Sequence, residues 1–524
     1  MATTETDHII TSIKPNNGGE ETIFEEAKGL LSHKDAAKTL NGVEPKELTG
    51  KLTGALLFAV FASAIGGSFV FGYHIGCINA PGDLIQKWIG DNHFQIHSSN
   101  IQKSEIDMIW AVTVAIFSIG GMIGGLLSGT VADKMGRKGG LLANNGLIMI
   151  AGLFMGLAKH SNFYYMMIMG RLIIGLACGL ASGLVPMYLC EIAPPNLRGT
   201  LGSVHQLAVT ISILFSQILG HPSIFGTEEL WQYIFLFTLI PSGIQLALLP
   251  FAPESPKWIL NVKNSPETAA AALKKLRGTD DVQDELDQFI VEAEETRNTE
   301  KAGLLDMFKG DLRQPMIIAI MMMLSQQLSG INAAMFYSTS IFMSAKLSAE
   351  TAVYATIGMG LVNVIQTLVS TWLVDHPKFG RKPLHLAGLS GMLITSLGLV
   401  AALTMQNSNV TEAIKSIGSY ASIAFVLLFV VSFATGPGSI PWFFVSEIFT
   451  SSARGTASSI ACMVNWTAAF LVGLLFPTFQ RILGQYTFLI FVGFLGFFIF
   501  YTYKFVPETK GKSVDQIKKE LEKK

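Results

Sequence analysis

Two stretches of this chain repeat each other 256 residues apart. Residues 191–200 and 447–456 each begin with Glu, place Arg seven residues later, continue with Gly-Thr and lead into an apolar run. Three more pairs recur in the same order at offsets of 244 to 254 residues: Gly136-Arg137-Lys138 with Gly380-Arg381-Lys382, Ile78-Asn79-Ala80 with Ile331-Asn332-Ala333, and Pro253-Glu254-Ser255 with Pro507-Glu508-Thr509. Four ordered repeats predict that the chain consists of two homologous halves.

The apolar content places both halves in a membrane. Half of the residues are hydrophobic and only 14% are charged, against roughly 25% in soluble domains. A bilayer core needs about 20 apolar residues per helix, and twelve segments qualify. They are 53–79, 108–131, 140–158, 163–189, 200–220, 231–251, 314–343, 351–374, 384–404, 418–445, 457–477 and 484–505. The expected fold class is an all-α integral membrane protein with twelve transmembrane helices in two homologous six-helix halves, and duplicated membrane halves are typical of transporters.

Polar stretches divide the chain further. Residues 252–313 are too charged to cross lipid and form the expected cytoplasmic linker, with short amphipathic helices at 269–276 and 284–295. The other expected parts are a disordered cytoplasmic tail at 1–51, an amino-terminal half at 52–251, a carboxyl-terminal half at 314–505 and a cytoplasmic tail at 506–524.

Lysine and arginine set the expected orientation. With both termini in the cytoplasm, one of the 37 Lys and Arg residues lies within a span and only six lie outside, as the positive-inside rule requires. Those six are Lys87, Lys103, Lys159, Lys346, Lys415 and Arg481. The sequon Asn409-Val410-Thr411 falls in an outside loop, which agrees with a multi-pass plasma-membrane protein. A net charge of -1 gives no reason to expect a nucleic-acid partner.

Charged residues gather where the predicted helices meet the cytoplasm. Their repetition in both halves favours a gate of ion pairs that joins the halves when the inner side is closed and breaks when it opens. Ordinary topology signals and contacts with lipid headgroups are the alternative. The predicted network consists of Asp133, Arg137, Arg171, Glu191, Arg198, Asp375, Arg381, Glu447 and Arg454.

Amide side chains stand inside several spans, where hydrocarbon offers them no partner, so they must face the bundle interior, a cavity or each other. They are Gln206, Gln326, Gln327, Asn332, Asn363 and Asn465, and Trp442 lies in the same half as most of them. Neutral amides both donate and accept hydrogen bonds, and an indole can pack against the face of a sugar ring. Such a set fits a neutral polyol better than an ion, although any single amide could instead join two helices.

Residues 52–512 resemble the facilitative glucose transporters of the sugar porter family, within the major facilitator superfamily. The motifs that carry the resemblance are Gly170-Arg171, Pro186-Met187-Tyr188, Arg198-Gly199, Pro253-Glu254-Ser255-Pro256, Gln326-Gln327-Leu328-Ser329-Gly330-Ile331-Asn332, Gly436-Pro437-Gly438 and Pro507-Glu508-Thr509-Lys510-Gly511. The resemblance implies that the hexose is bound by Gln206, Gln326, Gln327, Asn332, Asn363, Trp442 and Asn465. The triplet Gln327-Leu328-Ser329 accompanies glucose preference in that family.

Two proline- and aromatic-containing segments are candidate gates. Pro437 and Pro441, with neighbouring glycines, should break the tenth span, and Trp442 follows the break at the cytoplasmic side. On the outer side, Tyr337 follows Asn332 in span seven and could close over the sugar.

Competing functions remain open from the sequence. Proton-coupled relatives keep a carboxylate within Gly-Tyr-Asp of span one, where this chain has Gly72-Tyr73-His74. Passive uniport is therefore expected, with His74 as the one candidate for a titratable coupling group and proton-sugar symport as the alternative. A sugar sensor that does not transport is a third, remote possibility. No enzyme activity, cofactor, metal site or ATP-binding loop is indicated, and the sequence does not give an oligomeric state.

Overall fold

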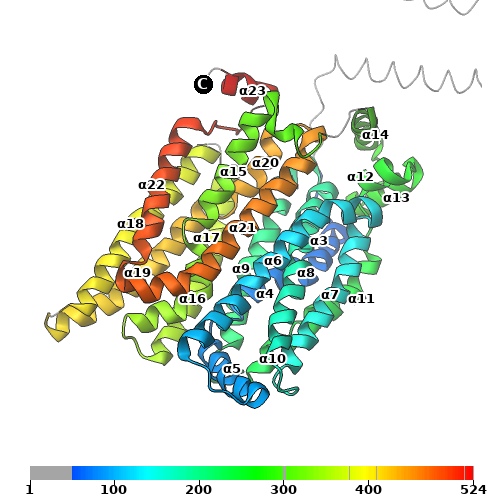
Figure 1. Cartoon of the computed structure of the whole chain (residues 1–524). Coiled ribbons are helices and arrows are strands. Elements are labelled where there is room, and N and C mark those ends of the chain that lie inside the picture. Colours follow the sequence, from blue (N-terminus) through cyan, green and yellow to red (C-terminus); the bar gives the residue numbers. More distant parts are fainter. Residues whose placement is uncertain are drawn as a thin grey trace, which may run out of the picture. The chain divides into compact units, whose positions relative to one another are not determined.

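The computed structural model describes residues 50–298, 302–376, 378–408, 410–510, 512 and 514–522. Every regular element in these ranges is a helix (Figure 1). Twelve candidate membrane spans follow one another in the order expected from the sequence, which confirms the predicted fold class. They are Gly54–Gly76, Lys103–Met135, Arg137–Leu157, Tyr165–Ile192, Pro195–Leu219, Trp231–Phe251, Gly310–Ser344, Ala349–Val374, Arg381–Asn407, Glu412–Val445, Ala453–Tyr486 and Phe488–Phe505.

The helices extend further than the apolar runs. Span two was expected at 108–131, but α6 covers Lys103–Met135 because its polar ends keep helical backbone beyond the hydrocarbon. Span eleven was expected to end at Pro477, but α21 (Ser451–Leu483) continues through that proline. Neighbouring helices in a membrane bundle can satisfy the carbonyl that a proline frees, so the helix need not end there.

Several spans consist of two helices each, and two of these breaks matter for the site. Gly330 begins the second helix of span seven with φ +93°, a left-handed conformation that glycine adopts without penalty. The break that the prolines predicted in span ten occurs at residues 436–439. The helices concerned are α15 (Arg313–Gln327) and α16 (Ile331–Ser344) in span seven, and α19 (Glu412–Thr435) and α20 (Ile440–Ile448) in span ten.

The two halves meet mainly along two pairs of helices. α6 packs against α21, and α9 (Arg198–Leu219) packs against α17 (Ala349–Asp375). Glycine permits the first contact, since a Cβ atom on Gly121 would lie 2.5 Å from the Trp466 ring. Close packing near the middle of α6 and α21 therefore joins the halves there.

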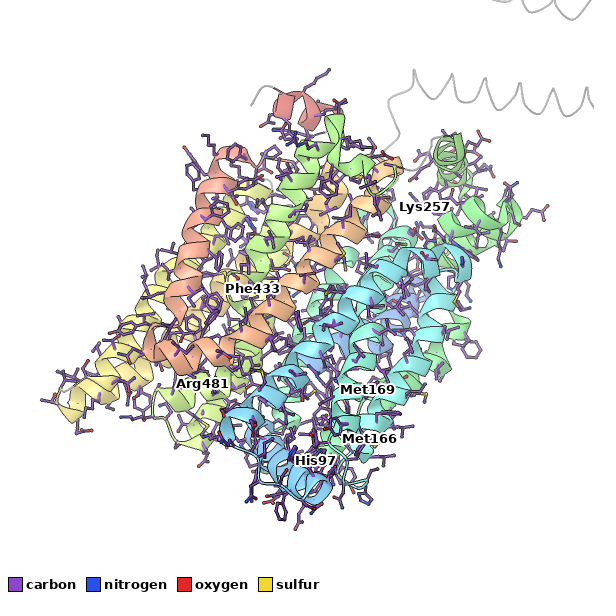
Figure 2. The ribbon with its side chains drawn as sticks, viewed as in Figure 1. His97, Met166, Met169, Lys257, Phe433 and Arg481 are labelled. Carbon is purple, nitrogen blue, oxygen red and sulfur yellow. The ribbon has the colours of Figure 1, made fainter. Side chains whose placement is uncertain are left out.

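The linker forms short helices at one end of the bundle. α13 (Pro266–Arg277) and α14 (Gln283–Asn298) lie where the sequence predicted amphipathic helices, and a buried ion pair joins Arg277 to Glu285 at 2.7 Å. Figure 2 shows Lys257 at this end, with His97 and Arg481 at the opposite end of the bundle. Asn409, the predicted glycosylation site, lies outside the described residues.

Candidate substrate site and its gates

The break in span ten is held by an amide from span seven. Gln326 Nε2 donates hydrogen bonds to the backbone carbonyls of Pro437 at 2.9 Å and Gly438 at 2.8 Å. Its Oε1 accepts from Asn465 Nδ2 of α21 at 2.7 Å. Because the broken helix frees these carbonyls from their usual intrahelical partners, the Gln326 side chain satisfies them inside the membrane.

The amide chain continues across the break in span seven. Gln327 Nε2 donates to Asn465 Oδ1 at 3.0 Å, and Asn332 Nδ2 donates to Gln327 Oε1 at 2.5 Å. From the sequence, these amides were expected on one face of a continuous helix. That expectation is wrong, because the helix stops at Gln327 and restarts after Gly330. The break nevertheless brings Asn332 within hydrogen-bond distance of Gln327.

We call Gln326, Gln327, Asn332 and Asn465 the amide cluster. Three other predicted binding residues do not belong to it. Gln206 on α9 is half-buried and makes no hydrogen bond with any described residue. Asn363 on α17 is 2% exposed, and its Oδ1 has no partner among the described residues. Trp442 on α20 is half-buried and packs against the apolar core. Contact of these three with a substrate stays a prediction.

The amide cluster is electrically neutral and holds its members by mutual hydrogen bonds. Such a cluster is buried without an unpaired charge, which keeps the cost of burial low. Amide oxygens and nitrogens match hydroxyl groups in both donor and acceptor roles. No group of three or more His, Cys, Asp or Glu side chains that could hold a metal ion occurs among the described residues.

The end of the bundle opposite the linker is closed by a residue that the sequence analysis did not assign to the site. Asn79, at the end of span one, donates from Nδ2 to Ser338 Oγ at 2.5 Å, and its Oδ1 accepts from the backbone N–H of Thr339 at 3.3 Å. These bonds join the amino-terminal half to α16. The repeat gave a signal for this, because Asn79 occupies the position in Ile-Asn-Ala that Asn332 occupies in the second copy.

Tyr337, the predicted outer gate, lies beside this closure. Its hydroxyl donates to the backbone carbonyl of Gly473 at 2.9 Å, and its ring stacks on Phe476 with centroids 5.4 Å apart. Its backbone is non-helical, with φ -129° and ψ 17°, so α16 is kinked at this residue. The role of Tyr337 as a gate stays a prediction.

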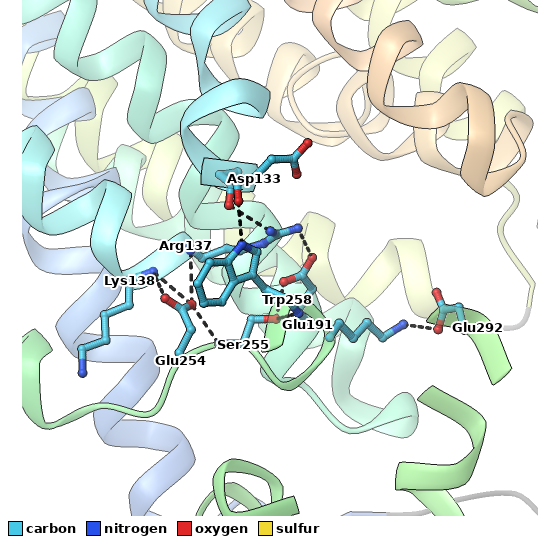
Figure 3. A network of polar contacts seen from close by, with 10 residues as sticks. Asp133, Arg137, Lys138, Glu191, Glu254, Ser255, Trp258 and Glu292 are labelled. Carbon is cyan, nitrogen blue, oxygen red and sulfur yellow. Dashed lines mark hydrogen bonds and ion pairs between the residues drawn. The ribbon is translucent and has the colours of Figure 1, made fainter. Parts of the chain in front are cut away.

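An ion-pair network lies at the linker end of the amino-terminal half (Figure 3). Arg137 Nη2 lies 2.8 Å from Glu191 Oε1, and the other Glu191 oxygen accepts from the Ser255 hydroxyl. The Glu254 carboxylate accepts from the backbone N–H groups of Arg137 and Lys138 at 3.2 and 3.1 Å, where a carboxylate complements the amino end of a helix. The start of span three, the end of span four and the linker are thereby joined.

The carboxyl-terminal half contains the same network. Arg381 Nη2 lies 3.1 Å from Glu447 Oε1, and the other Glu447 oxygen accepts from the Thr509 hydroxyl. Glu508 accepts from the backbone N–H groups of Arg381 and Lys382 at 2.9 and 3.2 Å. Each ion pair thus lies within its own half, so the expected pairing across the halves does not occur at these residues in this structure. Pairing across the halves in another conformation stays a prediction.

Arg171 does not belong to either ion-pair network, which corrects the expectation from the sequence. Its guanidinium is fully buried in span four, lies 4.5 Å from the centroid of the Phe117 ring and donates from Nη1 to the backbone carbonyl of His74 at 2.9 Å. The carbonyl oxygens of Thr113 and Val114 lie 3.4 and 3.5 Å away from its other nitrogens. Main-chain dipoles and an aromatic face therefore solvate this cation.

The His74 side chain is enclosed beside Arg171. Its Nε2 is hydrogen-bonded to Thr238 Oγ1 at 2.9 Å, and its Nδ1 lies 3.6 Å from Cys77 Sγ. Both ring nitrogens are thus engaged within the amino-terminal half. His74 is fully buried and separate from the amide cluster, which lies in the carboxyl-terminal half.

The remaining predicted gate residues differ in their surroundings. Arg198 is exposed at the start of α9, and Arg454 Nη2 donates to the Phe449 carbonyl at 3.3 Å. The backbone carbonyl of Asp133 accepts from Trp258 Nε1 at 3.0 Å. Asp375 is the last residue of α17, and its side chain lies outside the described part of the chain.

Twelve spans in two repeated halves, with a neutral amide cluster at a broken helix, define a membrane solute carrier. The family described as "Sugar (and other) transporter" matches residues 59–521, and the chain belongs to this family. A relative from Caenorhabditis elegans named "Facilitated glucose transporter protein 1" is 58% identical over 474 residues, covering 90% of this chain and 92% of the relative. The human "Solute carrier family 2, facilitated glucose transporter member 3" is 43% identical over 477 residues, covering 90% and 94%.

Solved structures agree with the fold. The major facilitator superfamily proton:xylose symporter XylE, bound to 6-bromo-6-deoxy-D-glucose, superposes with a TM-score of 0.73 at 26% identity, covering 90% of this chain and all of that one. A partially occluded inward open conformation of the xylose transporter XylE from E. coli gives a TM-score of 0.72 at 25% identity, covering 88% of this chain. The fold is therefore that of the major facilitator superfamily.

Proposed function

We propose that this protein carries glucose and similar hexoses passively across the plasma membrane by alternating access, without a cofactor. The observation that carries the proposal is the neutral amide cluster at the break of span ten, joined by hydrogen bonds from Gln326, Gln327, Asn332 and Asn465. The names of the glucose-transporting relatives support the choice of substrate. Gln206, Asn363 and Trp442 complete the proposed site from neighbouring helices.

The proposed cycle uses the closures described above. The bonds of Asn79 to α16 close the outer end, and opening that end requires them to break. The network within each half clamps its helices together, so each half can rock as one body around the site. The Lys and Arg distribution supports cytoplasmic termini, with the linker helices on the inner side.

Proton coupling is the second candidate, since XylE is a proton symporter and His74 is titratable. The geometry favours uniport. The ring of His74 is engaged by Thr238 and Cys77, and the cationic Arg171 is bound to the backbone carbonyl of the same residue. A second positive charge on His74 would be repelled by Arg171 in a buried environment.

Uptake of radiolabelled D-glucose into proteoliposomes, with and without an inward proton gradient, tests the proposal. We expect uptake to stop at equal concentrations on both sides, with or without the gradient, and L-glucose serves as the non-substrate control. Accumulation above equilibrium under the gradient would establish symport instead. Binding of glucose without uptake would identify a sensor.

A further inference from the structure

Two histidines lie together at the end of the bundle opposite the linker, and the site described above uses neither. His93 and His97 belong to α5 (Gly82–His97), the helix between spans one and two, and Figure 2 shows His97 at this end. Residues four apart on an α-helix lie on one face, and the centroids of the two imidazole rings are 4.4 Å apart. This is the one contact between two histidine rings in the part of the chain that the structure describes.

A tyrosine hydroxyl lies behind each histidine. His93 Nδ1 lies 3.2 Å from the Tyr164 hydroxyl, and His97 Nε2 lies 3.4 Å from the Tyr165 hydroxyl. The other ring nitrogens, His93 Nε2 and His97 Nδ1, have no hydrogen-bond partner among the described residues. A histidine that binds a metal donates its second ring N–H to an oxygen, which fixes the tautomer and the orientation of the ring. Each histidine therefore has one nitrogen beside an oxygen and one nitrogen left to act as a ligand.

The start of span four holds α5 in place. Asn92, the neighbour of His93, is 1% exposed, and its Oδ1 accepts from the backbone N–H of Tyr164 at 2.9 Å. The rings of Tyr164 and Tyr165 stack with centroids 4.2 Å apart, at the beginning of α8 (Tyr165–Ile192). Groups other than the histidines thus fix α5 against α8, and a ligand pair that is already positioned loses less freedom when it binds an ion.

The surroundings of the pair favour a cation. α5 ends at His97, and the carbonyl groups of its last turn give this end of the helix a partial negative charge. His93 lines a cavity of about 510 Å³ whose wall also includes Glu105, so water molecules that complete the coordination of an ion have room there. His97 is exposed, so an ion can reach the pair.

We propose that His93 and His97 bind one divalent cation of the late first-row transition metals, such as Zn²⁺ or Cu²⁺. Each histidine supplies one ring nitrogen, Tyr164 and Tyr165 orient the rings, and water completes the coordination. Imidazole is a ligand that these ions prefer, whereas Ca²⁺ and Mg²⁺ prefer oxygen. In the orientation proposed above, the site faces the outside of the cell, so the cation comes from the external medium.

Calorimetric titration of the full chain with Zn²⁺ tests the site, on protein purified in detergent with a tag that contains no histidine. Wild type is compared with His97→Gln. His160→Gln is the matched control, because His160 is a single exposed histidine in the loop that precedes Tyr164. Residues that only orient a metal ligand typically contribute about 10- to 100-fold to metal affinity. We therefore expect the loss of a ligand in His97→Gln to weaken Zn²⁺ binding by about 100-fold or more, with the control like wild type.

Equal Zn²⁺ affinity in wild type and His97→Gln would overturn the site, and so would an equal loss in His160→Gln, which would mean non-specific binding to surface histidines. Electron paramagnetic resonance of bound Cu²⁺ is the second measurement. We expect hyperfine splitting from the nitrogen nuclei of two imidazoles in wild type, and splitting from only one would contradict the pairing. Because binding is measured without sugar, a failure of this inference leaves the proposed function intact, and an absence of glucose uptake leaves the metal site intact.

Discussion

The two halves are alike at the end of the bundle that carries the linker and differ at their centre. Arg137 pairs with Glu191 at 2.8 Å, and Arg381 pairs with Glu447 at 3.1 Å, each pair with the same supporting hydroxyl and carboxylate. The side chains of the amino-terminal pair are 10% and 15% exposed, against 15% and 25% for the carboxyl-terminal pair. Both halves therefore contain the same ion-pair network, and the amino-terminal copy is more deeply buried.

The centre of the protein shows the opposite. The carboxyl-terminal half holds four mutually bonded amides at a broken helix, whereas the amino-terminal half contributes Gln206, which has no partner among the described residues. A repeated clamp makes each half move as a unit, which both halves need for rocking. Substrate binding needs an asymmetric surface, because a sugar presents different hydroxyl groups to its two sides.

The largest effect should follow from removing the amide that joins the cluster to span ten. Gln326→Leu removes a proposed contact to the substrate and leaves the carbonyls of Pro437 and Gly438 without their donor. We expect glucose affinity to fall about 100-fold, equivalent to about 3 kcal/mol. The half-saturation of uptake in proteoliposomes measures this.

Gln206→Leu is the matched variant in the other half. Because Gln206 bonds to no described residue, its removal costs only the proposed substrate contact, and we expect glucose affinity to fall about fivefold. Equal losses for the two variants would contradict the asymmetry between the halves.

Gly330→Ala should have the next largest effect, on the break of span seven. Gly330 has φ +93°, and a Cβ atom there would lie 2.7 Å from the Phe491 ring. The strained backbone and the clash together should destabilise the present arrangement of this break by about 2 kcal/mol. Because Asn332 would then be displaced from Gln327, we expect weaker glucose binding. Gly496→Ala is the control, since a Cβ atom there meets open space. Unchanged binding in Gly330→Ala, or an equal loss in the control, would refute this account.

Particular residues show which features could be predicted from the sequence and which could not. The fold followed from the apolar runs and the repeats, because bilayer thickness fixes the length of a span. The amide cluster followed from its composition, since amides in hydrocarbon need partners. The carbonyl partners of Gln326 could not be predicted from the sequence, because they depend on how the broken helix turns. The role of Asn79 also needed the structure, because its partners lie more than 250 residues away in the chain.

The Arg137–Glu191 and Arg381–Glu447 ion pairs should differ modestly in their contribution to stability. Glu191→Gln removes the charge that faces Arg137 in the more buried pair, and Glu447→Gln does the same for Arg381. We expect losses of about 1.5 and about 0.5 kcal/mol in unfolding free energy, because burial strengthens a charged hydrogen bond and exposure weakens it. Thermal unfolding in detergent measures both, and a larger loss for Glu447→Gln would reverse the comparison.

The smallest effect should come from His74, the residue that most distinguishes uniport from symport here. His74→Asn keeps a polar group that can bond to Thr238 and leaves the backbone carbonyl that binds Arg171 unchanged. We expect glucose uptake within about twofold of wild type at both about pH 6 and about pH 8, the range in which an ordinary histidine titrates. A pH-dependent accumulation that is present in wild type and lost in His74→Asn would make His74 the coupling group. That result would show that the amino-terminal half supplies the driving reaction, rather than only a wall of the site.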